Sequence, residues 1–261
     1  MTRKIIAIAN QKGGVGKTTT VVNIAAGLAE QGKKVLCIDL DPQGNTTSGL
    51  GMEVDDKSIY EVIMGRMKLT DVMEETEFKN LSIAGSDVRL ANAELELVEV
   101  EKREYRLKTA VQSVQQDFDF IFIDCPPSLG LLTINALGAA DSVLIPIQCE
   151  YYALEGVASL MNTISRVKKT INPHLEIEGV LLTMLDGRTN LGLQVVDEVK
   201  KHFKKQVYAT VIPRSVRLGE APSHGEPIHV YDKRSAGCVA YVNLAKEVLK
   251  RNNIKVKEFK L

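Results

Sequence analysis

A glycine-rich segment near the beginning of the chain limits its possible folds more than any other feature. It follows an apolar, strand-like run over 5–10, opens a run with helical spacing of apolar residues over 18–31, and reads Lys12-Gly13-Gly14-Val15-Gly16-Lys17-Thr18-Thr19. Glycines allow backbone N–H groups to converge on phosphate oxygens, and a helix N-terminus adds a partial positive charge. A chance glycine turn before a helix is the alternative, but the strand, loop and helix context favours a phosphate-binding loop.

This segment departs from the usual P-loop pattern, G-x-x-x-x-G-K-[ST], which would need glycine where the chain has Gln11. A second lysine, Lys12, opens the loop instead. Lys17 is expected to reach the β- and γ-phosphates of a nucleotide, and the Thr18 hydroxyl is expected to ligate Mg²⁺. Taken alone, Lys12 is as consistent with a solvated surface lysine as with a functional one.

Strand-like and helical runs alternate through most of the chain. Further apolar, β-rich runs cover 35–40, 120–125, 143–147, 179–184 and 207–212, and helical patterns lie near 105–116, 152–170, 190–204 and 236–251. The apolar runs are continuous rather than alternating, which is typical of strands buried on both faces. We therefore predict an α/β fold, a mostly parallel twisted sheet with helices on both faces.

The domain organisation is predicted to be simple. No repeat, low-complexity tract or Pro/Gly linker divides the sequence, so residues 1–261 are predicted to form one domain, with 252–261 as a basic tail. The least regular part is 52–104, which is acidic and rich in loop residues. This part is expected to form short helices laid on the sheet.

Three carboxylates follow two of the apolar strands. Asp124 ends the run Phe-Ile-Phe-Ile-Asp, and Asp39 and Asp41 end the run over 35–40. A strand of this kind places its terminal residue at the carboxyl edge of the sheet, where phosphates bind in doubly wound folds. Asp124 is therefore expected to hold Mg²⁺ there, directly or through water. Side chains alternate along a strand, so Asp39 and Asp41 are expected to share a face and reach the same end.

The charge balance is neutral overall but uneven along the chain. The 33 basic and 33 acidic residues cancel, yet residues 1–130 carry a net charge of −5 and residues 131–261 a net charge of +5. Neutrality argues against a protein permanently bound to DNA or to a membrane surface, whereas the split is compatible with conditional binding. The four scattered cysteines indicate buried thiols in a reducing compartment, so the cytoplasm is expected.

The motifs together resemble a known family. K-G-G-V-G-K-T-T, D-L-D-P-Q-G-N and F-I-D-C-P-P resemble the deviant Walker A ATPases, and three downstream segments narrow the resemblance to the ParA/Soj partition ATPases of chromosomes and plasmids. Those segments are T-M-L-D-G-R-T at 183–189, I-P-R-S-V-R-L at 212–218 and E-A-P-S-H-G at 220–225. The similarity covers residues 3–250 and has the short form of the family, without an N-terminal regulatory domain.

The resemblance implies roles for single residues around ATP and Mg²⁺. Lys12 corresponds to the family's signature lysine, which enters the partner's site in a homodimer that sandwiches ATP. Lys17 is the phosphate lysine of its own subunit. Thr18, Asp41 and Asp124 form the metal site, and Asp41 also orients the attacking water. The loop residues Gly13, Gly14, Val15, Gly16 and Thr19 complete the phosphate cradle. Adenine is expected against Met184, Pro213 and Ser215, although the family often has Asn where this chain has Ser215.

The resemblance also implies DNA binding and a set of partners. Arg188 and Arg217 resemble the family's DNA-binding arginines, and we predict that Lys200 and Lys204, spaced i, i+4 on one helix, add to them. For the helix lysines, a solvated face is an equally good interpretation. The expected partners are a second copy of the chain, non-specific double-stranded DNA and a ParB-type centromere-binding protein. The expected location is cytoplasmic and nucleoid-associated.

Two alternatives belong to other functional classes. The basic tail would suit a membrane-positioning ATPase like MinD, but Asn252 and Asn253 interrupt its helical pattern and it lacks a broad apolar face, so no stable membrane anchor is expected. The other alternative is a metabolic or redox enzyme on the same scaffold, such as an iron–sulfur ATPase or an ATP-dependent ligase. The scattered cysteines disfavour a cluster.

Overall fold

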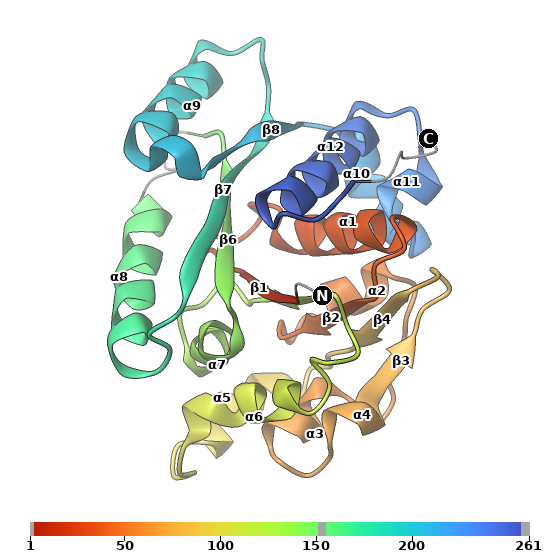
Figure 1. The fold of residues 1–261 in the computed structure, drawn as a ribbon, viewed down its shortest axis with the longest axis vertical. Helices are drawn as coiled ribbons and strands as arrows, with labels where there is room; N and C mark the ends of the chain where they lie inside the picture. The colour runs from red at the N-terminus through yellow and green to blue at the C-terminus, as the bar shows by residue number, and fades with distance from the viewer. Residues whose placement is uncertain (1–2, 151–154, 257–261) are drawn as a thin grey trace.

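In the described part of the chain, one eight-stranded sheet organises the fold (Figure 1). The computed structural model describes residues 3–150 and 155–256. Its strands are β1 Lys4–Ile8, β2 Val35–Asp39, β3 Met73–Glu75, β4 Leu81–Ala84, β5 Phe120–Asp124, β6 Ser142–Gln148, β7 Glu176–Leu185 and β8 Val207–Pro213. They are ordered β3-β4-β2-β5-β1-β6-β7-β8, and every neighbouring pair is parallel except β3 and β4. The predicted, mostly parallel α/β fold is confirmed.

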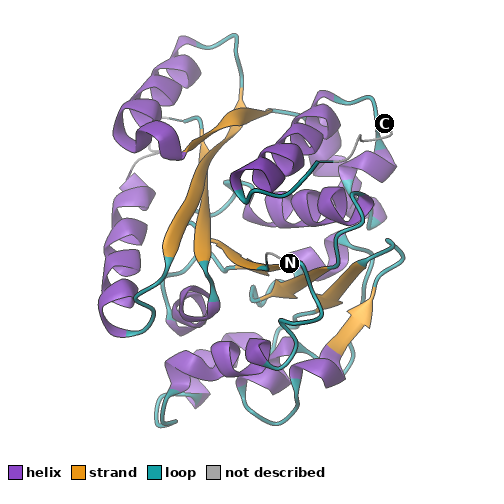
Figure 2. Cartoon of the chain, viewed as in Figure 1, coloured by secondary structure: helices purple, strands orange, loops and turns teal. Residues whose placement is uncertain are grey.

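Helices cover both faces of this sheet (Figure 2). The α-helices are α1 Lys17–Glu30, α2 Asn45–Gly49, α3 Ile59–Ile63, α4 Leu69–Val72, α5 Leu90–Glu96, α6 Arg106–Gln112, α7 Leu131–Ala139, α8 Glu155–Thr170, α9 Asn190–Phe203, α10 Val216–Glu220, α11 Ile228–Tyr231 and α12 Ala236–Arg251. Short 3₁₀ turns are η1 Arg103–Tyr105, η2 Lys204–Gln206 and η3 Ala221–His224. One hydrophobic cluster joins the sheet to α3 through α9, and the other joins it to α1, α10, α11 and α12.

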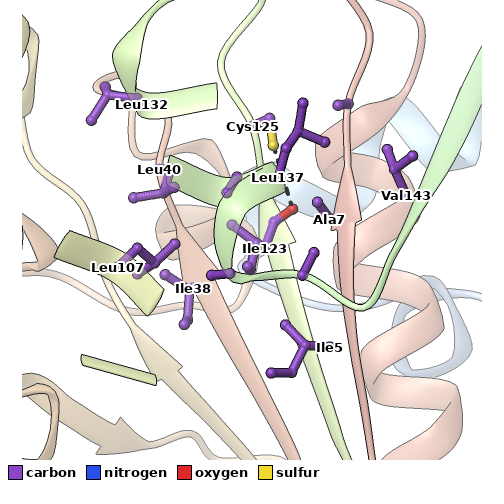
Figure 3. Close-up of a cluster of buried hydrophobic side chains, with 14 of the residues drawn as sticks. Ile5, Ala7, Ile38, Leu40, Leu107, Ile123, Cys125, Leu132, Leu137 and Val143 are labelled. Carbon is purple, nitrogen blue, oxygen red and sulfur yellow. Dashed lines mark hydrogen bonds between the residues drawn. The ribbon is translucent and has the colours of Figure 1, made fainter. Parts of the chain in front are cut away.

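Alternation along β1 connects the sheet to both clusters. Ile5 and Ala7 belong to the cluster under α3 through α9, whereas Ile6 and Ile8 belong to the cluster under α1 and α12. Figure 3 shows part of the first cluster, where Ile5 and Ala7 lie near residues of β2, β5 and α7. Because successive side chains of a strand point to opposite faces, a strand buried on both sides must be apolar throughout.

The segment 52–104 corrects one expectation. It forms short helices, as predicted, but it also adds two strands, β3 and β4, to the sheet. β4 pairs with β2 in parallel and β3 pairs with β4 in antiparallel, which makes β3 an edge strand. β3 has only three residues and β4 only four. The apolar run of β4 is too short to stand out in the sequence, and β3, Met-Glu-Glu, has none, so pairing with the sheet fixes both strands.

The carboxyl ends of the central strands lie at one edge of the sheet. In the strand register, Ile8 of β1 and Asp39 of β2 both lie opposite Asp124 of β5. The loop that joins β1 to α1 starts at this edge, because it follows Ile8 directly. The glycine-rich segment and the three carboxylates therefore meet, as the order of elements predicted.

At the other side of the sheet, where the parallel strands begin, side-chain contacts join the first and last described elements. Glu178 near the start of β7 forms an ion pair with Lys4 of β1 at 3.5 Å and accepts hydrogen bonds from Ser142 Oγ and Asn252 Nδ2, both at 2.7 Å. Arg251, the last residue of α12, donates to the carbonyls of Glu178 and Val207 at 3.4 and 2.7 Å.

Within the described residues, no helix is both long and apolar enough to cross a membrane.

Candidate functional site

The glycine-rich loop has the backbone geometry of an anion cradle. Gly14 and Gly16 adopt left-handed conformations, with φ of +72° and +87°, which other residues rarely adopt. A Cβ placed on Gly13 or Gly14 would meet no heavy atom within 4 Å, so the space above this backbone is open. Gly16 is the N-cap of α1 and makes no side-chain cap bond, which leaves the first N–H groups of a 14-residue helix for a ligand.

Two polar side chains to which the sequence analysis assigned no role hold the loop in place. Asn10 donates to the carbonyl of Pro146 in β6 at 2.7 Å and accepts from the backbone N–H of Lys12 at 3.0 Å. Thr183 of β7 donates to the carbonyl of Val15 at 2.9 Å. The loop is therefore anchored to two neighbouring strands, and its shape exists before any ligand arrives.

Lys17 points into the loop of its own subunit. Its side chain is buried, with 7% of the residue exposed, and its Nζ donates to the carbonyl of Lys12 at 3.4 Å. Burial lowers the pKa of the Lys17 ammonium, while the nearby carboxylate of Asp124 opposes this shift. A buried cation with a single long hydrogen bond has little solvation to lose when an anion approaches.

Asp124 presents an unused oxygen at the end of β5. Its Oδ2 accepts hydrogen bonds from the hydroxyls of Thr18 and Thr46, both at 2.7 Å, whereas its buried Oδ1 has no partner within the described chain. Burial raises the pKa of Asp124 to about 6, against the opposing hydrogen bonds from both threonines and the charge of Lys17. A buried carboxylate oxygen without a partner, beside a threonine hydroxyl, fits a divalent cation.

Asp39 and Asp41 play different parts in this structure. Asp39 is fully engaged, because it accepts bonds from the backbone N–H of Asp41 at 3.1 Å and from the N–H and hydroxyl of Thr47 at 2.9 and 2.8 Å. Burial raises its pKa to about 7, and the charge of Asp124 adds to this shift. Among the described residues, the Asp41 carboxylate accepts a hydrogen bond only from the N–H of Gln43, and the residue is 8% exposed. Asp39 therefore lies at the predicted end of its strand, but its carboxylate is occupied and braces β2 against α2.

A metal at this edge would need ligands from outside the protein. In the parts of the chain that the structure describes, no group of three or more His, Cys, Asp or Glu side chains is arranged to hold a metal ion. Mg²⁺ prefers octahedral oxygen coordination and commonly takes one or two protein ligands, with phosphate and water completing the shell. The donors that are present, Thr18 and Asp124, fit a metal that arrives with a phosphate group.

A cavity of about 360 Å³ lies next to the loop, with Gly16 and Thr19 on its wall. Met184, Pro213 and Ser215, the residues expected around adenine, all line it, and Tyr241 of α12 lines it as well. Met184 has a φ of +53°, an uncommon conformation for a residue with a side chain. The cavity is mostly apolar and adjoins the phosphate cradle, which suits the base of a nucleotide.

The cationic residues expected to bind DNA are exposed, but several are paired with carboxylates. The Arg188 side chain is 89% exposed and donates to Asp186 at 2.8 and 2.7 Å, which lowers the pKa of Asp186 to about 2. The Arg217 side chain is 55% exposed and contacts Glu220 at 2.9 Å. Such exposed pairs contribute little energy, so the guanidinium groups remain available to phosphates.

The predicted helical pairing of Lys200 with Lys204 is wrong. Helix α9 ends at Phe203, and Lys204 has a φ of +49° and begins the turn η2. The helix stops there because Phe203 is buried and β8 begins at Val207, so the chain must turn within three residues. Of the predicted basic tail, residues 252–256 follow the end of α12 at Arg251, and 257–261 lie outside the described residues.

Comparisons with known proteins find relatives that match the chain over most of its length. Residues 3–177 match a family described as an AAA domain. The chain is 60% identical over 247 residues to the sporulation initiation inhibitor protein Soj of Bacillus subtilis, covering 94% of this chain and 98% of that protein. It is 51% identical over 254 residues to the chromosome partitioning protein ParA of Myxococcus xanthus, covering 97% and 90%.

A solved structure is similar over the full length of both chains. It is that of cobyrinic acid a,c-diamide synthase from Mycobacterium smegmatis with bound ADP and magnesium, at 39% sequence identity and a TM-score of 0.84.

Proposed function

This chain belongs to the ParA/Soj family of chromosome-partitioning ATPases, and on that basis we propose that it works as an ATP-dependent switch for DNA binding. Two copies close around ATP and Mg²⁺, and the closed dimer binds double-stranded DNA without sequence preference. Hydrolysis of ATP reopens the dimer and releases the DNA. A ParB-type centromere-binding protein stimulates hydrolysis and so sets where release occurs.

The different surroundings of the two loop lysines carry this proposal. Lys17 is turned inward and donates to its own loop. The Lys12 side chain is 34% exposed, and its ion-pair partner in the described chain is Glu150, at the long distance of 3.7 Å. Lys12 can therefore leave its own subunit at small cost. A lysine supplied to the partner's site would neutralise charge on the γ-phosphate and make hydrolysis depend on dimerisation.

Within one subunit, the remaining residues would divide the work of binding and hydrolysis. The backbone of residues 13–19 and the Lys17 ammonium would hold the β- and γ-phosphates. Thr18 and Asp124 would hold Mg²⁺, which neutralises phosphate charge when bound. Asp41, which has capacity to accept further hydrogen bonds, would orient the attacking water near the metal. Met184, Pro213 and Ser215 would enclose the base.

The DNA-binding surface would combine Arg188, which follows β7, with Arg217, which follows β8. These strands are neighbours in the sheet, so their carboxyl ends lie on the same side of the molecule. Lys200 and Lys204 would add charge near the end of α9, without the helical pairing predicted from sequence. Contacts of this kind are made to phosphates, so the affinity should not depend on base sequence and should fall with salt.

We expect Asp41→Ala to bind duplex DNA at least about tenfold more tightly with ATP than with ADP, because slow hydrolysis keeps two charged surfaces together. Fluorescence anisotropy with a labelled duplex of arbitrary sequence measures this difference. Adding Arg188→Ala or Arg217→Ala should weaken the ATP form and flatten its salt dependence. Lys57→Ala, at a lysine far from β7 and β8 in the chain, is the control and should change neither. Equal affinity with ATP and ADP would refute the switch.

A further inference from the structure

Glu150 connects the glycine-rich loop to the wall of the base cavity. It lies two residues beyond the end of β6. Its Oε2 lies 3.7 Å from Lys12 Nζ, and its Oε1 accepts hydrogen bonds from Arg214 at 3.1 Å and from Gln148 Nε2 at 2.6 Å. Arg214 also lines the cavity beside Met184. The Glu150 carboxylate therefore contacts both Lys12, the first lysine of the loop, and Arg214, a cation on the wall of the cavity.

The pair between Glu150 and Lys12 has the properties of a reversible restraint. The Lys12 and Glu150 side chains are 34% and 45% exposed, so water screens their attraction. The backbone of Lys12 is fixed separately, since its N–H donates to Asn10. Release of the Lys12 side chain consequently requires only rotation of that side chain, with no rearrangement of the loop.

The Lys12 ammonium cannot stay beside Glu150 and at the same time reach phosphates in a second subunit. We propose that Glu150 is a positioning residue that retains Lys12 in its own subunit until the nucleotide of a partner subunit competes for it. This inference rests on the proposed function, because it requires Lys12 to act in the partner's site. Glu150 thereby raises the protein concentration at which the ATP-bound form dimerises.

The size of the effect follows from the exposure of the pair. A partly exposed ion pair changes an equilibrium by up to about fivefold. A symmetric dimer releases two such lysines, so removing both restraints should tighten dimerisation by up to about 25-fold. Glu150→Gln keeps the size of the side chain and can still accept hydrogen bonds from Arg214 and Gln148. The variant therefore removes chiefly the charge that restrains Lys12.

A different explanation must be separated from this one. The negative charge of Glu150 lies near the nucleotide site, so its removal could tighten nucleotide binding through weaker repulsion alone. In that case Glu150→Gln would tighten ADP binding to the isolated subunit, and its effect would persist without Lys12. If Glu150 acts through Lys12, ADP affinity stays the same and the effect disappears in a Lys12→Gln background.

The test measures dimerisation by sedimentation with a non-hydrolysable ATP analogue. Glu150→Gln should lower the dimer dissociation constant several-fold, up to about 25-fold, relative to wild type. Glu198→Gln is the matched control, because it removes an exposed pair with Lys201 on α9 and should leave dimerisation unchanged. The same comparison in a Lys12→Gln background, at concentrations that populate its dimer, should show no effect of Glu150→Gln. An unchanged constant in the single variant, or an equal change in both backgrounds, overturns the inference.

A second readout does not need the dimer. In nucleotide-free protein, Glu150→Gln should increase the rate at which an amine-reactive reagent labels Lys12 several-fold and leave Lys34 unchanged, as measured by mass spectrometry. Unchanged labelling of Lys12 would overturn the restraint. Wild-type protein that stays monomeric with the ATP analogue would overturn the proposed function as well, whereas a wild-type dimer with an inert Glu150→Gln variant would overturn this inference alone.

Discussion

Replacement of Lys12 by glutamine should lower ATP turnover by about a thousandfold or more while nucleotide affinity changes only a few-fold. The reason is the division of labour between the two lysines of the loop. Lys17 remains buried in its own cradle and still binds phosphates, whereas the exposed Lys12 would be lost from the partner's site. Steady-state turnover and binding of a fluorescent ADP analogue measure the two quantities separately.

Mixing two inactive variants tests whether Lys12 acts across the dimer. A subunit with Lys12→Gln keeps Asp41, and a subunit with Asp41→Ala keeps Lys12. A mixed dimer therefore contains one complete site. If subunits exchange at random, an equimolar mixture should recover about one quarter of wild-type turnover, since half of the dimers are mixed and each has one active site of two. Turnover no higher than that of either variant alone would show that Lys12 serves its own subunit.

The control for Lys12→Gln is Lys34→Gln. Lys34 is an exposed lysine next to the start of β2, at the edge of the sheet opposite the loop. Its replacement removes the same charge from the protein, and turnover should stay at the wild-type value. A comparable loss in both variants would mean that overall charge, rather than the position of Lys12, controls the rate.

Asp124→Asn should reduce turnover by about a hundredfold or more and raise the stability of the nucleotide-free protein at neutral pH. Turnover falls because the unpartnered Oδ1 that suits Mg²⁺ is no longer part of a carboxylate. Titration of turnover with MgCl₂ should show that more metal is needed. Stability rises because the fold buries a charge that the metal would otherwise neutralise.

The pH dependence of unfolding has a definite sign. The fold raises the pKa of Asp124 from 3.8 to about 6, so this group supports folding fully below its unfolded pKa and loses that support as pH rises through about 6. By pH 8 the loss amounts to about 3 kcal/mol. Asp39 shifts in the same direction. Urea unfolding at pH 5 and pH 8 should show a smaller decrease in the free energy of unfolding for Asp124→Asn than for wild type.

Asp119→Asn is the control on the same strand. Asp119 stands next to the opposite end of β5, where it accepts the backbone N–H of Lys34, a bond that asparagine can also accept. Its replacement should change neither turnover nor the pH dependence of unfolding. An Asp124→Asn variant with wild-type turnover at low MgCl₂ would exclude Asp124 as a metal ligand.

The sequence predicts those parts of the site that depend on local order. Lys17 and Thr18 follow from a strand, a glycine loop and a helix in succession, and Asp124 follows from its place at the end of a buried strand. Thr46, Thr183 and Glu150 could not be found in this way. Each contacts the loop or Asp124 through tertiary packing, and an ordinary Thr or Glu near a strand end has no distinguishing spacing.

The errors in the sequence predictions have the same cause. Lys204 continues a helical pattern in the sequence, yet burial of Phe203 and the start of β8 end the helix before it. β4 is too short for its periodicity to be recognised, and its place beside β2 defines it as a strand. The end of a strand places Asp39 near the site, as predicted, but only the fold shows that its carboxylate already accepts two hydrogen bonds from Thr47.

The contacts at Glu178 have a consequence for protein engineering. They bring Lys4 and Asn252, which lie near the two ends of the chain, to the same carboxylate at the edge of the sheet opposite the glycine loop. A circular permutant is therefore feasible, with a flexible linker between the segments beyond Lys4 and Asn252 and new ends opened at the exposed residues 101–102. Such a permutant would retain ATP turnover if spatial neighbourhood, rather than the order of elements along the chain, determines this sheet.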